Sequence, residues 1–188
     1  MRINMLRFFL FLLAVILAGN RCNAQQPADK PADEKSLPRI AGIATVVRKN
    51  SHADVIIGRV LRGYSLNDQQ PRPDLRLTSL FVDQVPRGDL SREWSKTYGF
   101  PIADSVAEAL THGSNTLNVD GVLLIAEHGD YEKSATGNKQ FPKRRLFGEV
   151  ARTFEAAGRS VPVFSDKHLA DNWTDAKWIY DRAKELEV

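Results

Sequence analysis

Short apolar segments alternate with segments of helical periodicity along most of this chain, and this alternation restricts the fold more than any other feature. Strands separated by helices pair in parallel, because each helix crosses back over the sheet between two strands. We therefore predict an α/β domain with a doubly wound, mostly parallel sheet. The predicted strands are residues 40–47, 75–82, 100–103, 119–126 and 161–164, and the predicted helices are residues 52–61, 89–98, 104–110, 143–157 and 173–186.

The first 24 residues have the pattern of a secretory signal peptide. Arg2 and Arg7 give a positive start, and the apolar run of residues 8–18 follows. Cys22 and Ala24 then supply small residues at the positions that precede a cleavage site. The apolar run is too short to be a permanent membrane span. We therefore expect export to the periplasm or the extracellular space.

The leader carries the excess of positive charge. It contains three arginines and no acid, so its removal lowers the 26 basic side chains to 23, against 23 acidic ones. A neutral mature chain does not favour nucleic-acid binding. Cys22 also leaves with the leader, so the mature chain has no disulfide and no cysteine ligand or nucleophile. We interpret residues 25–38, rich in Pro, Ala, Asp and Lys, as a disordered linker and residues 39–188 as a single domain.

Polar side chains follow the ends of the predicted strands. Because the carboxyl ends of parallel strands meet at one edge of a sheet, we expect these side chains to line a common site. The alternative is that each of them caps its own helix or is simply solvated. The candidates are Arg48, Lys49, Ser51 and His52 after the first strand, Asp83 after the second, Glu127 and His128 after the fourth, and Asp166, Lys167 and His168 after the fifth.

Two chemistries suit such an edge. Lys167 could act as an acid or a cation beside a bound substrate, with Asp166 and His168 adjusting its charge. The histidines could instead hold zinc or manganese together with Glu127 and Asp130, for a hydrolase or lyase. The metal hypothesis is the weaker one, because the chain has no His-x-x-x-His or His-x-x-Glu pair, and we assign no metal ligand.

Three consecutive basic residues, Lys143, Arg144 and Arg145, open the long helix predicted from residue 143. Positive charge in the first turn opposes the helix dipole, so an anionic or phosphate partner is one explanation. A solvated basic face is the other explanation, and the simpler one.

Four segments carry a resemblance to a known family. They are residues 89–102 (DLSREWSKTYGFPI), 104–110 (DSVAEAL), 119–126 (VDGVLLIA) and 158–170 (GRSVPVFSDKHLA). They resemble the Rossmann-like nucleotide-binding domain of the glucose–fructose oxidoreductase, inositol dehydrogenase and MocA family. The resemblance implies an oxidoreductase that uses NAD or NADP on a sugar or polyol. It places Lys167 on the family's catalytic lysine, with Asp166 and His168 beside it, and Asp83 on its ribose-binding acid. It also makes Arg48, Lys49, Ser51 and His52 the cofactor-facing turn.

The chain departs from that family at two places. The family has glycines in the first turn, which let the backbone approach a pyrophosphate, whereas residues 47–52 are VRKNSH and Gly42 lies inside the strand. The family also continues into a sixth strand and a substrate domain, so we expect this sequence to be truncated there or the domain to be lost. Three alternatives stay open: an exported oxidoreductase, a non-redox descendant that binds a small molecule or partner, and a metal-dependent hydrolase or lyase.

Overall fold

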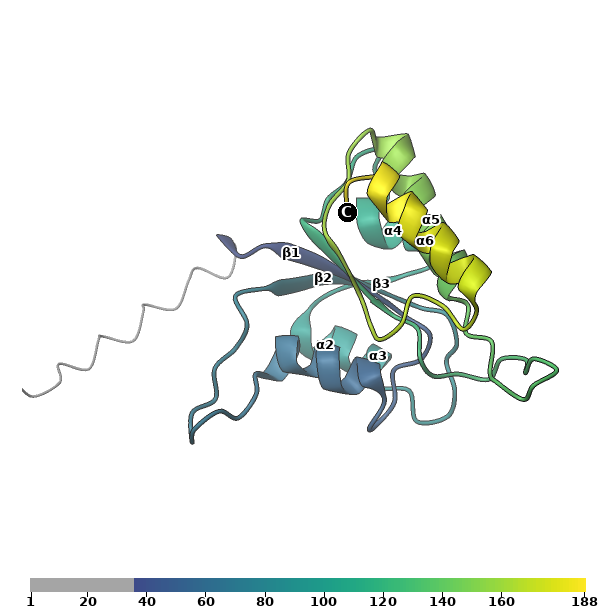
Figure 1. Ribbon diagram of the computed structural model, residues 1–188. Helices are drawn as coiled ribbons and strands as arrows, with labels where there is room; N and C mark the ends of the chain where they lie inside the picture. Colours follow the sequence, from purple (N-terminus) through teal and green to yellow (C-terminus); the bar gives the residue numbers. More distant parts are fainter. Residues whose placement is uncertain (1–35) are drawn as a thin grey trace, which may run out of the picture. The chain divides into compact units, whose positions relative to one another are not determined.

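The computed structural model describes residues 36–188, which form one five-stranded sheet with helices on both faces (Figure 1). Neighbouring strands are parallel and lie in the order β3-β2-β1-β4-β5, which confirms the predicted doubly wound α/β fold. The elements are β1 (Arg39–Ala44), α2 (His52–Arg62), β2 (Arg76–Val82), α3 (Ser91–Tyr98), β3 (Ile102–Ala103), α4 (Val106–Thr111), β4 (Gly121–Ile125), α5 (Lys143–Ala157), β5 (Val163–Ser165) and α6 (Trp173–Glu185). The predicted signal peptide and most of the predicted linker lie outside the described residues. Among the described helices, none combines the length and the apolarity needed to cross a membrane.

Two apolar cores lie on opposite faces of the sheet. On one face α4, α5 and α6 cover the sheet, and Ile43, Leu146 and Phe154 are buried beneath them. On the other face α2 and α3 cover it around Ile57 and Leu80 (Figure 1). A central strand covered on both faces needs apolar residues at successive positions, which explains the continuous apolar sequence of β4.

Gly42 serves packing in the core. A Cβ at this position of β1 would lie 2.8 Å from Leu80 Cδ1 and 3.3 Å from Ile57 Cδ1. Those two side chains come from β2 and α2, so the glycine allows α2 to pack closely against the sheet. Gly42, the glycine nearest the first turn, therefore serves the packing of the core. The turn itself contains only residues with side chains.

The fifth strand is exposed, and the prediction of a buried strand there was wrong. Within residues 36–188, β5 pairs with β4 alone and forms an edge of the sheet. Its central residue, Phe164, is 49% exposed. A short apolar run does not distinguish a central strand from an edge strand, because the difference lies in the neighbouring strands. Trp173, at the start of α6, is likewise 78% exposed, whereas Ile179 is the residue that α6 buries.

Local signals account for most helix boundaries. α5 covers Lys143–Ala157 as predicted, and Gly158 ends it in the left-handed conformation. The predicted start of the second helix at Asp89 was wrong by two positions, since α3 begins at Ser91 with Leu90 as its cap. The Asp89 carboxylate still accepts hydrogen bonds from the Ser91 amide and hydroxyl, so it stabilises the first turn from one residue further back.

Candidate functional site

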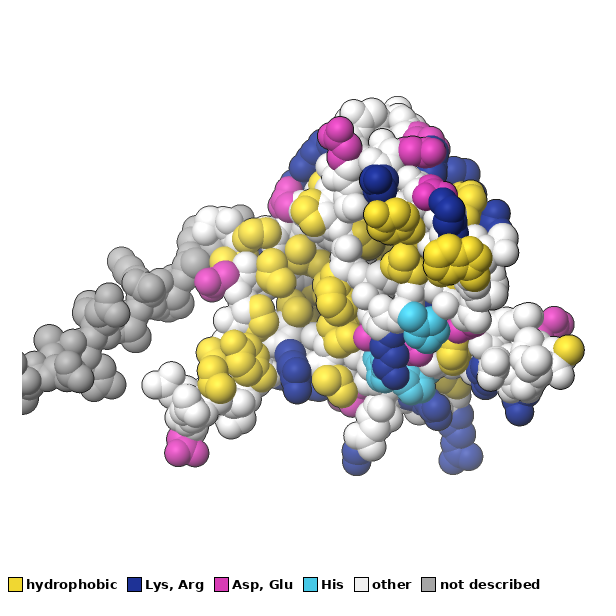
Figure 2. Space-filling view, viewed as in Figure 1, with side chains coloured by type: hydrophobic (Ala, Val, Ile, Leu, Met, Phe, Trp, Pro, Cys, Tyr) yellow, Lys and Arg dark blue, Asp and Glu magenta, His cyan; other side chains and the backbone are white. Residues whose placement is uncertain are grey.

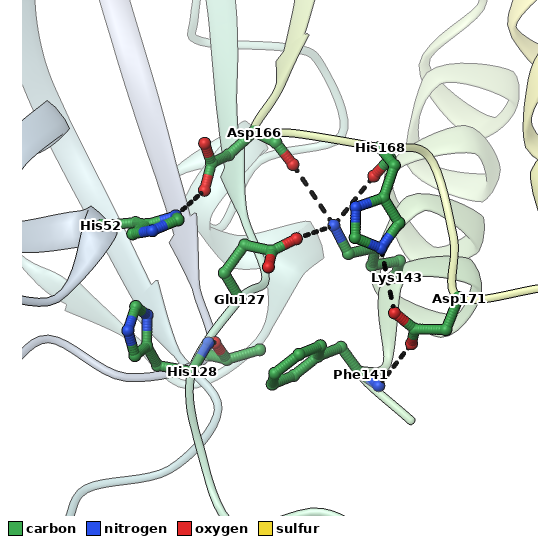
Figure 3. Close-up of polar contacts among 9 residues, drawn as sticks. His52, Glu127, His128, Phe141, Lys143, Asp166, His168 and Asp171 are labelled. Atoms are coloured by element: carbon green, nitrogen blue, oxygen red, sulfur yellow. Dashed lines mark hydrogen bonds and ion pairs between the residues drawn. The ribbon is translucent and has the colours of Figure 1, made fainter. Parts of the chain in front are cut away.

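The carboxyl ends of β1, β4 and β5 bring four of the predicted site residues together (Figure 3). His52 is the first residue of α2, whose cap is Ser51. Glu127 and His128 follow β4, and Asp166 follows β5. In this strand order the winding of the sheet reverses between β1 and β4, and doubly wound sheets bind their ligands at that point.

His52 and Asp166 form the central contact of the cluster. His52 Nδ1 lies 2.5 Å from Asp166 Oδ2, although the two residues are 114 positions apart in the chain. A carboxylate can only accept, so the imidazole donates its Nδ1–H and keeps Nε2 as an acceptor. Their side chains are 28% and 11% exposed, which places the pair at the edge of the interior with access to solvent.

His128 lies beside this pair as a neutral imidazole. Its ring meets that of His52 edge to face, with centroids 4.8 Å apart. Burial lowers the pKa of His128, and its neighbours His52, Arg48 and Lys167 lower it further, while Glu127 opposes them. A lowered pKa keeps the ring uncharged at neutral pH. One ring nitrogen then donates a hydrogen bond and the other accepts one.

A buried ion pair lies on the interior side of the cluster and holds its segments together. The Lys143 ammonium binds the Glu127 carboxylate, and their side chains are 3% and 8% exposed. The same ammonium donates to the carbonyl of His168 at 2.8 Å and of Asp166 at 3.3 Å (Figure 3). These contacts use all three N–H groups of the lysine. Lys143 therefore joins the start of α5 to the segments that follow β4 and β5.

His168 forms a second histidine–aspartate pair. His168 Nε2 lies 3.1 Å from Asp171 Oδ1, and Asp171 Oδ2 accepts the Phe141 amide at 2.7 Å. The imidazole is about half exposed, so this pair lies further out than that of His52 and Asp166. The Asp171 contact also attaches the end of the segment between β4 and α5 to the segment after β5.

Lys167 is exposed and has a left-handed backbone conformation, with φ of 62°. Such a conformation is uncommon for a lysine and persists where surrounding contacts impose it. Here the carbonyls of Asp166 and His168, on either side of it, are both held by Lys143. Within residues 36–188 the ammonium of Lys167 has no hydrogen-bond or ion-pair partner.

Asp83, the expected ribose-binding acid, is already bound by side chains of the protein. Tyr131 donates to Asp83 Oδ2 at 2.6 Å, and Arg145 donates to Oδ1 at 2.6 Å. Burial, together with the hydrogen bond to Asp83, raises the pKa of Tyr131. Gln84 and the backbone of Asp130 exchange two further hydrogen bonds. The segment after β4 therefore crosses to the end of β2 and covers the acid.

Several amides of the first turn also have partners within the chain. The Asn50 amide donates to the Asp54 carboxylate at 2.9 Å, and the Ser51 amide donates to the Arg48 carbonyl at 2.9 Å. The Asp54 amide donates to the Ser51 hydroxyl. A pyrophosphate needs such amides free and no carboxylate beside them. With Asp83 engaged and Asp54 at the helix start, the residues present do not fit a dinucleotide.

The three basic residues at the start of α5 all meet acids. Lys143 is bound to Glu127 as described above. Arg144 pairs with Asp175 and also lies over the ring of Trp178. Arg145 pairs with Asp83 and with Glu149. The first-turn charges are therefore balanced by acidic side chains, and they give no support to an anion held there.

Lys143 is the important residue that the sequence analysis did not assign to the site. A signal for it was present, because Lys143 shares the helical spacing of the buried residues Leu146, Phe147, Val150 and Phe154. A charged residue on the apolar face of a helix must find a partner of opposite charge in the interior. That partner was not identifiable without the path of the chain after β4.

The metal hypothesis finds no geometric support in the described part of the chain. Residues 36–188 contain no group of three or more His, Cys, Asp or Glu side chains placed to hold a metal ion.

A cavity of about 620 Å³ lies elsewhere, between α4 and α5, and its lining includes Thr111, Glu149 and Arg152. No residue of the strand-end cluster contributes to it.

Comparison with known proteins gives a likeness to one solved structure. No family model matches the chain, and no curated protein matches it. The chain is similar to the crystal structure of apo scyllo-inositol dehydrogenase from Lactobacillus casei, with 11% sequence identity and a TM-score of 0.49. The match covers 80% of this chain and 34% of that one, so the chain spans about a third of the length of the dehydrogenase. A likeness this distant concerns the fold alone, and the activity has to be argued from the site.

Proposed function

We propose that the strand-end cluster is a small-molecule site in which His52 acts as a general base held by Asp166, without a bound dinucleotide. The observation that carries this proposal is the 2.5 Å contact between His52 Nδ1 and Asp166 Oδ2 at the point where the sheet reverses its winding. A histidine held in one tautomer by a carboxylate is a recurrent acid–base arrangement.

The arrangement suits a reversible proton transfer. His52 Nε2 takes a proton from a C–H or O–H group of the substrate, and the imidazolium that forms is stabilised by the Asp166 carboxylate. The same group can return the proton at another position, so no further reactant is required. His128 offers a neutral hydrogen-bonding group beside it. An oxygen-rich substrate such as a sugar or polyol fits this chemistry, because its hydroxyl and carbonyl groups can bind several polar side chains.

The test is proton exchange in deuterated water. The protein is incubated with pools of keto and aldo sugars, polyols and hydroxy acids, and deuterium incorporation is followed by NMR. A substrate is expected to exchange, and His52→Gln is expected to slow that exchange by about 10²-fold or more. His112→Gln is the matched control, since His112 is an exposed residue at the end of α4. Equal rates for His52→Gln and the wild type would refute the proposal.

A second candidate is the NAD- or NADP-dependent oxidoreductase that the family resemblance implies. One observation favours it, namely the strand order, because doubly wound sheets of this kind bind dinucleotides between β1 and β4. The engaged amides of the first turn and the engaged Asp83 oppose it.

We therefore expect residues 25–188 to bind NAD and NADP with dissociation constants above roughly 100 μM. The physical reason is that the Asn50 and Ser51 amides already have partners, and that the Asp54 carboxylate beside them repels a pyrophosphate. Calorimetric titration with each dinucleotide measures this directly. Low-micromolar affinity for either one would make the oxidoreductase the leading candidate.

Export also stays a proposal, because it rests on residues 1–24, outside the described part of the chain. N-terminal sequencing of the mature protein checks it. A start near Gln25 supports export, whereas a start at Met1 contradicts it.

A further inference from the structure

We propose that Arg48 and Lys167 form an anion-binding subsite beside His128, which recognises a carboxylate or phosphate group of the substrate. This inference rests on the proposed function of His52 and adds the chemical class of the molecule that the site accepts. It differs from a dinucleotide site, because it requires one anionic group and no backbone cradle.

The balance of charge at this edge of the sheet favours an anion. Three acids at the strand ends have basic partners: Asp166 meets His52, Glu127 meets Lys143 and Asp83 meets Arg145. The side chains of Arg48 and Lys167 find no such partner among residues 36–188. Both are exposed, so they can bind a ligand without first breaking an ion pair. Two exposed cations without an acidic partner in the described part of the chain, beside three paired acids, favour an anion.

The backbone on both sides of Lys167 is held in place by Lys143. The neighbours of Lys167 in the chain, Asp166 and His168, turn their carbonyls inward to Lys143. This fixes the backbone on both sides of Lys167 and imposes its left-handed conformation. The Cα of Lys167 therefore has a fixed position, so its side chain extends from a defined point, unlike the side chain of a lysine in an unconstrained loop.

Arg48 lies in a turn whose backbone is also held by hydrogen bonds. Its carbonyl accepts the Ser51 amide at 2.9 Å, and its backbone pairs with Asp89 in an isolated bridge. The turn that carries Arg48 therefore leads directly into His52 with a fixed geometry. Lys167 directly follows Asp166, whose carboxylate contacts His52, so both cations belong to the two segments that meet at the His52–Asp166 pair. Both charges also lower the pKa of the neighbouring His128. Figure 2 shows histidine and basic side chains gathered on one face of the molecule.

These positions give the two cations complementary roles. A guanidinium can bind a carboxylate or phosphate through two parallel hydrogen bonds, and an ammonium adds a compact charge. His128 supplies a neutral donor or acceptor for a further oxygen of the ligand. An anionic group bound here would hold the rest of the substrate against His52, whose ring touches that of His128.

The test measures the affinity of the full protein for phosphate and, separately, for acetate. Each ion is titrated while the imidazole resonances of His128 are followed by NMR. Arg48→Ala and Lys167→Ala are each expected to weaken binding about tenfold, because each removes one charge-assisted contact. Lys49→Ala is the matched control: this neighbouring lysine is exposed, and it is not among the groups that shift the pKa of His128. Tighter binding of one ion than the other identifies the anionic group as phosphate or carboxylate.

Binding that is unchanged in Arg48→Ala and Lys167→Ala would overturn the inference. So would an equal loss in Lys49→Ala, which would show diffuse attraction to a basic surface. The proposed function has a separate outcome, because His52→Gln is expected to bind phosphate within about twofold of the wild type while losing exchange. Exchange without selective anion binding would leave the general base in place and remove the subsite. Anion binding without exchange would support the subsite and refute the role of His52 as a general base.

Discussion

Replacing Lys143 with methionine is expected to lower the free energy of unfolding by about 3–5 kcal/mol. The substitution removes the ammonium but leaves the Glu127 carboxylate in the interior, where its side chain is 8% exposed. It also leaves two backbone carbonyls, of Asp166 and His168, without their donor. Removing one partner of a buried pair costs more than the pair itself contributes, because the other charge stays buried without compensation. Urea unfolding followed by circular dichroism measures the difference.

The control for this prediction uses the same substitution at an exposed ion pair. Lys177 and Asp181 pair on the surface of α6 with about half of each side chain exposed, so Lys177→Met is expected to change stability by less than about 1 kcal/mol. The double variant Lys143→Met/Glu127→Leu is expected to recover most of the loss, since it removes both buried charges. Equal effects of Lys143→Met and Lys177→Met would show that the buried pair does not support the fold as described.

Replacing Asp166 with asparagine is expected to slow any exchange reaction at the site by about 10²–10⁴-fold. The substitution keeps the size of the side chain but removes the negative charge that holds the His52 Nδ1–H and would stabilise an imidazolium. Lys143 contacts the backbone carbonyl of this residue, so the fold around it should persist. Nitrogen-15 NMR of the imidazole reports the tautomer of His52 without requiring a substrate. The wild type is expected to carry its proton on Nδ1, and Asp166→Asn a mixture.

Asp171→Asn is the matched control, because it makes the same change in the outer histidine–aspartate pair. The asparagine carbonyl can still accept the Phe141 amide, so the structure should be preserved and the rate should stay within a few-fold of the wild type. If Asp171→Asn abolished exchange and Asp166→Asn did not, the catalytic pair would be that of His168, and the role proposed for His52 would have to be given up.

The sequence predicted the fold because the relevant signals are local. The alternation of apolar segments with helical spacing predicted the parallel sheet, and the boundaries of α5 were predicted to the residue. The same alternation predicted that polar residues after the strands would share an edge, since parallel strands all end on one side. His52, Glu127, His128 and Asp166 do lie together there (Figure 3).

The tertiary structure decided which of these residues pair. His52 meets Asp166 across 114 positions, and Asp83 meets Tyr131 across 48. Such contacts depend on the order of the strands and on the path of the segment that follows β4. That segment brings Tyr131 to Asp83, so the acid expected to bind a ribose is already hydrogen-bonded to the protein's own side chains.

The sequence by itself therefore determined the parallel sheet, the edge at which its polar residues gather and the absence of glycine from the first turn. Only the tertiary structure decided that Lys143 neutralises Glu127. It also decided that, among residues 36–188, β5 is an exposed edge strand and the side chains of Lys167 and Arg48 have no ion-pair partner. The physical reason is that periodicity records whether a side chain faces the interior. The partner it finds there is set by segments distant in the chain, whose packing no local pattern encodes.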